Sequence, residues 1–185
     1  MINNWHLDQA VAALQAGGVV LHATEGVWGL ACDPFNLNAV LKVLALKQRD
    51  VAKGLILVGS GTEDFASELA PLEDSARQRV LASWPGAQTW ILPNRRFPVW
   101  ISGGRDSIAV RVSGHPQTRA LAAAFGAPIV STSANPGGRQ PARNAIKARA
   151  YFQGLVDYVL PGAVLGDGGP TSIRTLDGEL VRGGR

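Results

Sequence analysis

Three hydroxyl side chains and an amide follow one short apolar run in this sequence. Residues 128–130 read Pro-Ile-Val, which is typical of a buried strand, and Ser131, Thr132, Ser133 and Asn135 come directly after it. In an open α/β sheet, ligands bind outside the carboxyl ends of the strands. Small hydroxyls at such a place can donate hydrogen bonds to a phosphate or a carboxylate. The alternative is that they cap loose backbone groups in ST-turns, which accounts for one or two hydroxyls more easily than for three.

Two further polar stretches carry groups that could bind an anion. The apolar residues 19–21 predict a strand, and a loop over residues 22–30 follows it with Thr24 and Glu25 near its start. The helix before residue 48 is expected to bury one face, made of Leu37, Val40, Leu41 and Leu44. It ends at Lys47 and Arg49. Basic residues in a last helical turn also complement the helix dipole, so a purely structural role remains the alternative for this pair.

Motifs for the commoner chemistries are absent from the sequence. It has no P-loop, no Gly-x-Gly-x-x-Gly and no Gly-x-Ser-x-Gly, and its single cysteine, Cys32, and three histidines lack zinc-ligand spacing. His6 and His115 are interpreted as a helix-start and a turn residue, and nothing pairs His22 with a nucleophile. The cations and hydroxyls at predicted loop or strand ends are Thr24, Lys47, Arg49, Lys53, Ser107, Arg111, Ser131, Ser133, Asn135 and Arg182. Such a set suits phosphoryl or nucleotidyl transfer, in which the protein mainly positions groups and neutralises charge.

Helices and strands alternate along the chain to position these residues. Strands are expected over residues 19–21, 55–58, 88–92, 108–112, 128–130 and 155–160. Helices are expected to begin at Asn4 and at Asn36 or Asn38, and to cover residues 62–69, 72–83, 117–125 and 144–152. Near the end, Asp177-Gly178 between two strand-like segments is a strong hairpin signal. The alternation with a terminal hairpin predicts an α/β fold with a mixed sheet.

Composition indicates one globular domain. The chain has 185 residues, 46% of them hydrophobic and 17% charged, which suffices for one well-buried core and is short for two domains. It contains no run of 18 apolar residues and no charged-then-apolar leader, so we expect a cytoplasmic protein without a membrane partner. The formal net charge of +4 permits an anionic partner such as a nucleotide or RNA without requiring one.

Taken together, these residues resemble the YrdC-like family of threonylcarbamoyl-AMP synthases over essentially the whole chain. Residues 23–30, Ala-Thr-Glu-Gly-Val-Trp-Gly-Leu, are similar to the family's Pro-Thr-Glu-Thr-x-Tyr-Gly-Leu, with departures at the first, fourth and sixth positions. Lys47-Gln48-Arg49 is similar to its Lys-x-Arg segment, and Ser133-Ala134-Asn135 to its Ser-x-Asn. Residues 84–86, 107–111 and 180–182 support the match.

The resemblance implies a twisted, mixed α/β sheet with flanking helices in a single YrdC-like domain of residues 1–185. It also implies a reaction in which L-threonine, bicarbonate and ATP give threonylcarbamoyl-adenylate and pyrophosphate. A carbamate formed on the threonine amine would attack the α-phosphorus of ATP, with Mg²⁺ on the phosphates and no metal site in the protein. Downstream transfer proteins would then place the threonylcarbamoyl group on an adenosine of tRNA.

Carried over position by position, the resemblance assigns roles to two sets of residues. The ATP site would comprise Lys47, Arg49, Lys53, Ser107, Ser133, Asn135 and Arg182, of which Lys47 and Arg49 would be catalytic. The threonine site would comprise Thr24, Arg111, Ser131, Thr171 and Ser172. Arg111 lies on a strand otherwise made of Ile, Ala and Val, so it is either a surface residue or a buried cation that needs an anion. The resemblance offers the threonine carboxylate as that anion, which a guanidinium can grip with two bonds.

Two other functions agree with part of the sequence. A non-catalytic module could bind double-stranded RNA or tRNA through a basic concavity, and the net charge with Arg95, Arg96 and Arg105 is compatible with it. RNA binding, however, needs no defined set of small hydroxyls, and weak tRNA binding is equally compatible with a synthase. A carbamoyl-transfer domain is the second alternative, but here no other domain supplies carbamoyl phosphate chemistry.

Overall fold

The computed structural model describes residues 4–166 and 168–183, so the expected domain limits at residues 1 and 185 lie outside the described residues. Its strands form one nine-stranded sheet in the order β7-β1-β2-β6-β3-β5-β4-β8-β9. They are β1 (Val20–Ala23), β2 (Trp28–Cys32), β3 (Ile56–Gly59), β4 (Gln88–Pro93), β5 (Ser107–Val112), β6 (Ile129–Ser133), β7 (Tyr158–Val159), β8 (Ser172–Arg174) and β9 (Leu180–Arg182). The pairs β1–β7, β3–β5 and β4–β8 are parallel and the others antiparallel, which confirms the mixed sheet.

Side-chain caps define where several helices begin. The helices are α1 (Asn4–Gln15), α2 (Leu37–Lys47), α3 (Ala66–Leu69), α4 (Asp74–Ala82), α5 (Val99–Ser102), α6 (Pro116–Phe125) and α7 (Ala145–Phe152), with 3₁₀ turns η1 (Val51–Lys53) and η2 (Thr62–Phe65). The Asn36 side chain accepts from the Ala39 N–H, and Asn144 likewise caps α7. Local sequence therefore sets these two helix starts, as expected.

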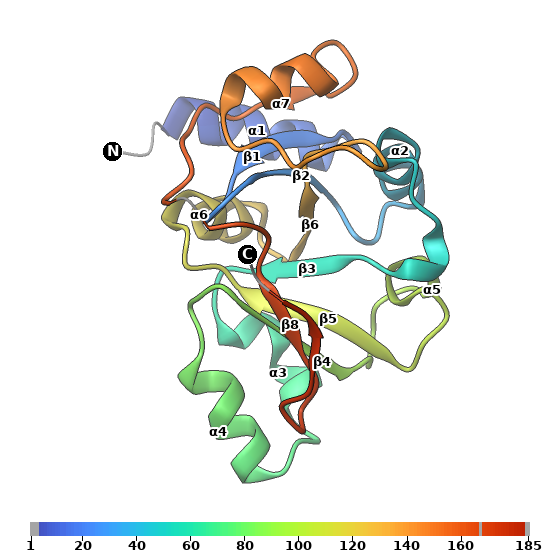
Figure 1. Ribbon diagram of the computed structural model, residues 1–185, viewed down its shortest axis with the longest axis vertical. Coiled ribbons are helices and arrows are strands. Elements are labelled where there is room, and N and C mark those ends of the chain that lie inside the picture. Colours follow the sequence, from blue (N-terminus) through green and yellow to red (C-terminus); the bar gives the residue numbers. More distant parts are fainter. Residues whose placement is uncertain (1–3, 167, 184–185) are drawn as a thin grey trace.

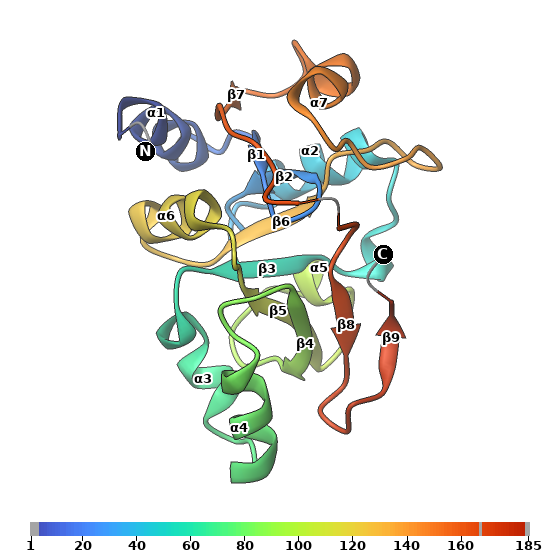
Figure 2. The same ribbon diagram turned by 60° about the vertical axis from the view of Figure 1, so that its left-hand side comes forward.

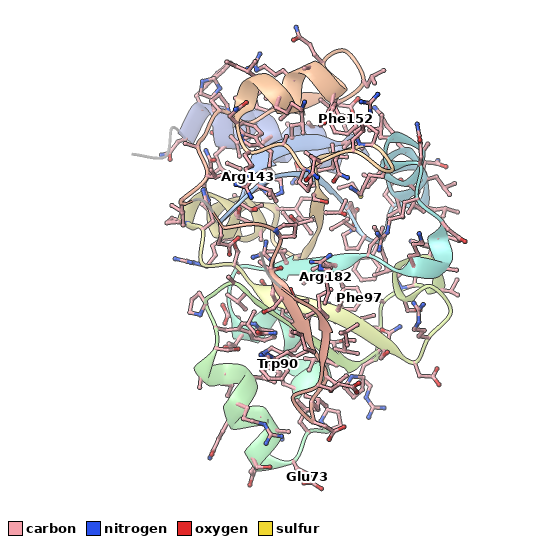
Figure 3. The ribbon with its side chains drawn as sticks, viewed as in Figure 1. Glu73, Trp90, Phe97, Arg143, Phe152 and Arg182 are labelled. Atoms are coloured by element: carbon pink, nitrogen blue, oxygen red, sulfur yellow. The ribbon has the colours of Figure 1, made fainter. Side chains whose placement is uncertain are left out.

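Two hydrophobic cores lie on opposite faces of the sheet. Helices α1 and α6 lie side by side in both views, and the smaller core beneath them includes Leu14, Val58 and Ile129 (Figures 1 and 2). The larger core, with α2 and α7 among its helices, includes Phe152 and Trp90, which lie far apart along the molecule in Figure 3. Successive residues of a strand point to opposite faces of the sheet. The register of the paired strands therefore identifies the polar side chains that lie on the same face as the smaller core.

The sheet curves so that its C-terminal edge returns toward its middle. Strands β5, β4 and β8 stand between β3 and β9 in the strand order. Even so, Arg182 of β9 lines the same cavities as Leu55 and Ile56 at the start of β3, and Figure 3 places Arg182 beside that strand. This curvature creates the concave region in which the candidate site lies.

Some expected boundaries differ from those of the structure. Strand β6 continues through Ser133 instead of ending at Val130, because Ser131 and Ser133 pair with Ala31 and Gly29 of β2. The loop expected over residues 22–30 is shorter, since β1 extends to Ala23 and β2 begins at Trp28. The strand expected over residues 155–160 is reduced to the two residues of β7. In the first two cases pairing with a neighbouring strand of the sheet extends an element beyond the apolar run that predicted it.

The buried face of α2 also differs from the expected one. Leu37 and Leu41 are 41% and 49% exposed. The buried residues are Ala39, Val40, Val43, Leu44 and Lys47. The helix therefore turns its last lysine inward, because its orientation is set by packing against β2 and not by a stripe of leucines alone.

Candidate active site

Two adjoining cavities occupy the concave region. We call them the serine cavity, lined among others by Thr24, Ser131 and Ser133, and the isoleucine cavity, lined among others by Ile91 and Ile101. Four residues line both cavities and so form their common boundary: Arg49, Leu55, Ile56 and Arg182. A ligand that occupies both cavities would pass two arginine side chains.

Most of the residues expected to bind ligands line these cavities. Thr24, Arg111, Ser131, Ser133 and Thr171 line the serine cavity. Lys53 and Ser107 line the isoleucine cavity, together with Arg105, which was not among the residues expected at the ATP site. Lys47, Asn135 and Ser172 line neither of them. Ser172 instead donates a hydrogen bond to Gln88 Oε1 at 2.7 Å and lines a neighbouring cavity.

Lys47 and Asn135 hold Ser133 from behind the cavity wall. The buried Lys47 ammonium contacts the backbone oxygen of Ser133, and lies 3.2 Å from the backbone oxygen and 3.3 Å from Oδ1 of Asn135. The Ser133 hydroxyl donates to the same Oδ1 at 2.7 Å. Burial, followed by the nearby charges of Arg49 and Arg182, lowers the pKa of Lys47 to about 8. The Lys-x-Arg and Ser-x-Asn segments are thus one hydrogen-bonded unit.

A tight turn after α2 fixes the position of Arg49. Its Nε and Nη2 donate to the backbone oxygen of Gly54 at 3.3 and 2.9 Å. Asp50 caps the turn by accepting from the Ala52 N–H at 2.9 Å. Gly54 has φ +65° and ψ 170°, a combination that is essentially restricted to glycine. The turn therefore presents Arg49 to both cavities in a defined orientation.

The cations that line the isoleucine cavity, including the two at its boundary with the serine cavity, have no acidic partner among the residues that the structure describes. Within the described part of the chain, the ion pairs are Lys42–Asp157, Arg77–Asp74, Arg96–Glu68 and Arg111–Glu25. Arg49, Lys53, Arg105 and Arg182 belong to none of them. Burial lowers the pKa of Arg49, and burial followed by the charges of Arg49 and Arg111 lowers that of Arg182. A bound polyanion would relieve this repulsion, so the boundary is suited to phosphate.

Arg111 is buried and already has an anion from the protein. Its Nη1 donates to Glu25 Oε1 at 2.6 Å, and the Ser113 hydroxyl and Gly114 N–H donate to the same oxygen at 2.8 and 2.7 Å. Burial raises the pKa of Glu25, but Arg111 and these hydrogen bonds outweigh it and lower the pKa to about 2. Glu25 Oε2 is buried and makes no hydrogen bond within the described part of the chain. Glu25 stands beside Thr24 in the sequence, where nothing indicates that it is the partner of Arg111.

His22 lies behind Ser131 and is completely buried. Its Nε2 lies 3.1 Å from Ser131 Oγ and its Nδ1 lies 3.4 Å from Thr118 Oγ1. His115, expected in a turn, is the N-cap of α6 and accepts from the Thr118 N–H. The sequence left His22 without a role because the contact with Ser131 crosses two strand pairings.

Comparison with known proteins identifies the family. The sequence model of the Sua5/YciO/YrdC family, described as telomere recombination, matches residues 12–184. The chain belongs to the Sua5/YciO/YrdC family. It is 50% identical to a Halorhodospira halophila protein named threonylcarbamoyl-AMP synthase, over 92% of this chain and 90% of that one. A Stutzerimonas stutzeri protein of the same name is 45% identical, over 98% of this chain and 99% of its own length.

Solved structures of the Sua5/YciO/YrdC family have the same fold. The structure of P. abyssi Sua5 complexed with L-threonine matches with a TM-score of 0.92 at 26% identity, over 100% of this chain. This chain spans 55% of the length of that protein. E. coli YciO matches with a TM-score of 0.87 at 24% identity, over 98% of this chain and 90% of YciO. In the part of this chain that the structure describes, no helix combines the length and apolar character required to cross a membrane.

The three Sua5/YciO/YrdC-like motifs converge on one place in the structure. Thr24 from the first motif, Arg49 from the second and Ser133 from the third all line the serine cavity. Besides His22, the residues that sequence reasoning missed are Arg105 and Glu25. Arg105 stands among the loop arginines, and Glu25 adjoins Thr24 in the first motif, so both were visible in the sequence without an indication of their partners.

Proposed function

We propose that this chain is a threonylcarbamoyl-AMP synthase that acts as a single domain. It joins L-threonine, bicarbonate and ATP into threonylcarbamoyl-adenylate and releases pyrophosphate. The observation that carries the proposal is the pair of adjoining cavities with Arg49 and Arg182 at their common boundary. An amino acid in one cavity and a nucleotide in the other would meet where two cations can stabilise a reacting phosphate. The names of the relatives described above support this assignment.

The isoleucine cavity suits the nucleotide. Ile91, Ile101 and Ile173 line it and offer apolar surface for a base. Arg49, Lys53, Arg105 and Arg182 also line it and are suited to the charges of a triphosphate. The Ser107 hydroxyl completes the polar contacts there. ATP placed in this way would direct its α-phosphate toward the serine cavity.

The serine cavity suits the threonine. Thr24 donates its hydroxyl proton to the Val27 backbone oxygen at 2.7 Å, which leaves its oxygen as a hydrogen-bond acceptor. Arg111, Arg49 and Arg182 line the cavity and would attract the carboxylate of an amino acid. Ser131 and Thr171 supply small hydroxyls on the cavity wall. The solved structure of P. abyssi Sua5 complexed with L-threonine supports an amino acid site in this fold.

The chemistry requires no nucleophile from the protein. The threonine amine bonds to the carbon of bicarbonate, from which one oxygen leaves as water, and this gives a carbamate. A carbamate oxygen then attacks the α-phosphorus of ATP while pyrophosphate leaves. Arg49 and Arg182 would stabilise the negative charge that grows on the transferred phosphoryl group, so Arg49 is the proposed catalytic cation. Mg²⁺ neutralises phosphate charge when it is bound. The described residues include no cluster of three or more His, Cys, Asp or Glu, so the ion would be held chiefly by the phosphates of ATP.

Lys47 is proposed to act on the nucleotide through Ser133 and Asn135. Its ammonium already has oxygen neighbours from both residues, and it does not line either cavity. A direct contact between Lys47 and phosphate stays a prediction of the sequence and would require the ammonium to leave these oxygens. By holding Ser133 near the turn that carries Arg49, Lys47 would align both residues with the nucleotide without leaving its oxygen neighbours.

The direct test is a reaction with ATP, labelled bicarbonate and one amino acid at a time. Pyrophosphate release should depend on L-threonine and should produce a labelled, acid-labile adenylate. Arg49→Ala should lower turnover by about 10², whereas Arg95→Ala, which removes an exposed charge outside both cavities, should leave it unchanged. Pyrophosphate release that does not depend on threonine would contradict the proposal.

The non-catalytic RNA-binding module is not favoured by the names of the relatives. Weak tRNA binding and transfer to downstream proteins remain part of the proposed role. If the RNA contact is electrostatic, its affinity should fall steeply with salt and differ little between RNA duplexes, which a filter-binding titration at several salt concentrations measures.

A further inference from the structure

Ser131 has a buried histidine, His22, within hydrogen-bond distance behind it. His22 of β1 and Gly29 of β2 are cross-strand partners, and their side-chain face is the one that Ser131 of β6 also shares. A Cβ at Gly29 would lie 3.1 Å from His22 Nε2 and 3.2 Å from Ser131 Oγ, so only glycine leaves this contact undisturbed. Ser131 is 5% exposed and lines the serine cavity.

The protons of this chain of groups can be assigned by elimination. The Thr118 hydroxyl donates its single proton to the Ala23 backbone oxygen at 2.9 Å. Toward His22 Nδ1, at 3.4 Å, Thr118 Oγ1 can therefore only accept, and Nδ1 must carry the proton. A neutral imidazole then has a bare Nε2, which lies 3.1 Å from Ser131 Oγ and can only accept from it.

The imidazole is held in its neutral form. His22 is 0% exposed, and burial, followed by the charges of His115 and Arg111, lowers its pKa to about 3. The Ala23 backbone oxygen and Glu25 act in the opposite direction but are outweighed. His22 therefore carries no charge at neutral pH, and the proton assignment above holds there.

We propose that His22 is a positioning residue that takes the Ser131 hydroxyl proton, so that Ser131 presents only its lone pairs to the serine cavity. Ser131 then accepts a hydrogen bond from an N–H or O–H group of the amino acid substrate. This inference rests on the proposed function for the identity of that substrate. It also reverses the expectation that Ser131 donates to a carboxylate or phosphate, because its one proton is already engaged.

Calorimetric titration with amino acid analogues tests this role. His22→Leu removes the acceptor at similar volume, whereas His22→Gln offers an amide oxygen near the position of Nε2. We expect His22→Leu to weaken threonine binding about three- to tenfold, the worth of one hydrogen bond, and His22→Gln to restore most of it. ATP binding should stay unchanged in both variants. The effect of His22→Leu should disappear in a Ser131→Ala background.

Two analogues show which substrate group meets Ser131. 3-Hydroxybutyrate lacks the amine of threonine and 2-aminobutyrate lacks its hydroxyl. For each analogue, the affinity of the wild type is divided by that of His22→Leu. This ratio should fall to one for the analogue that lacks the group donating to Ser131, and should stay above one for the other analogue. Equal threonine binding by wild type and His22→Leu would overturn the inference, and so would a ratio that persists with both analogues.

A second measurement needs no substrate. With ¹⁵N-labelled histidine, the ring signals of His22, identified by their loss in His22→Gln, should report a neutral ring protonated at Nδ1 between pH 6 and 8. A proton at Nε2, or a charged ring, would overturn the inference even if the His22→Leu variant failed to fold. If the wild-type protein bound no threonine while this tautomer was found, the proposed function would fail and the proton assignment would stand.

Discussion

At the scale of single residues, the buried pair of Arg111 and Glu25 connects stability with the candidate threonine site. Arg111 lines the serine cavity, but its Nη1 already donates a hydrogen bond to Glu25. Each member compensates the charge of the other in a region with little exposure to water. Removing one member of such a pair typically costs about 3–5 kcal/mol, because the other is left buried and unpaired. A variant of Arg111 therefore reports on folding as well as on substrate binding.

We expect Arg111→Ala to lose about 3–5 kcal/mol of unfolding free energy, and Arg111→Lys to recover part of it. Threonine affinity should fall in both variants if the guanidinium also holds the substrate carboxylate. Denaturant unfolding and calorimetric titration of the same samples separate the two effects. Glu25→Gln is the matched control, since it disturbs the pair but keeps the arginine. Full threonine affinity in a folded Arg111→Ala protein would show that Arg111 is only structural.

Glu25 should also make stability depend on pH in an acidic window. Its pKa is about 2 in the folded protein against an ordinary value of 4.5, so the unfolded chain binds the proton more readily. The stabilisation is therefore complete above pH 4.5 and is lost as the pH falls toward 2. The difference corresponds to about 3 kcal/mol at 1.36 kcal/mol per pH unit. Urea unfolding of wild type and Glu25→Gln should give stabilities that converge as the pH falls from 5 to 2; a constant gap would refute this.

At the scale of elements, the turn between α2 and β3 is the part that orients a catalytic candidate. The Gly54 carbonyl accepts hydrogen bonds from Arg49, and Gly54 itself approaches the C-terminal end of α5. A Cβ there would lie 3.2 Å from the Ile101 oxygen and 3.3 Å from the Ser102 oxygen. Gly54 therefore provides the backbone conformation of the turn, and it also allows the close approach of two segments that line the isoleucine cavity.

Gly54→Ala should therefore reduce stability by about 1–3 kcal/mol and also weaken ATP binding, because the Arg49 acceptor moves. The matched control is Gly126→Ala, at the end of α6, where φ is +84° and a Cβ would meet nothing within 4 Å. It should lose about 1 kcal/mol through backbone strain without any change in ATP affinity. Thermal unfolding and nucleotide titration measure both quantities. Equal ATP affinities in the two variants would contradict the proposed role of the turn.

At the scale of the whole molecule, curvature of the sheet brings the last strand to the site. Arg182 of β9 donates to the Thr171 backbone oxygen at 3.0 Å and lines both cavities. It faces Arg49 across the boundary, and neither has an acidic partner in the described residues. The ninth strand of the sheet is therefore needed to complete the candidate site, in addition to the motifs near the N-terminus.

Arg182→Ala should weaken ATP binding about tenfold or more, the cost of losing a hydrogen bond to a charged group. Threonine binding should change less, because Arg111 and Arg49 remain in the serine cavity. Arg95→Ala lowers the net charge equally without lining either cavity and controls for long-range attraction. Titrations at two salt concentrations complete the comparison. Equal losses in the two variants would mean that Arg182 acts only through overall charge.

The sequence by itself determined features that depend on neighbouring residues. A helix start at Asn36 or Asn38, a helix near residues 144–152, the hairpin around Asp177-Gly178 and the mixed α/β fold follow from local propensity and alternation. The motif residues were also identifiable, because their order along the chain carries the family resemblance.

Only the tertiary structure decided which of these groups meet. Glu25 and Arg111 are 86 positions apart, and His22 and Ser131 are 109 apart. No local periodicity encodes such pairs, since they arise from strand order and from the packing of helices on the sheet. The same reason explains the inward turn of Lys47 and the extension of β6 through Ser133, where pairing with β2 satisfies backbone groups that the sequence pattern assigned to a loop.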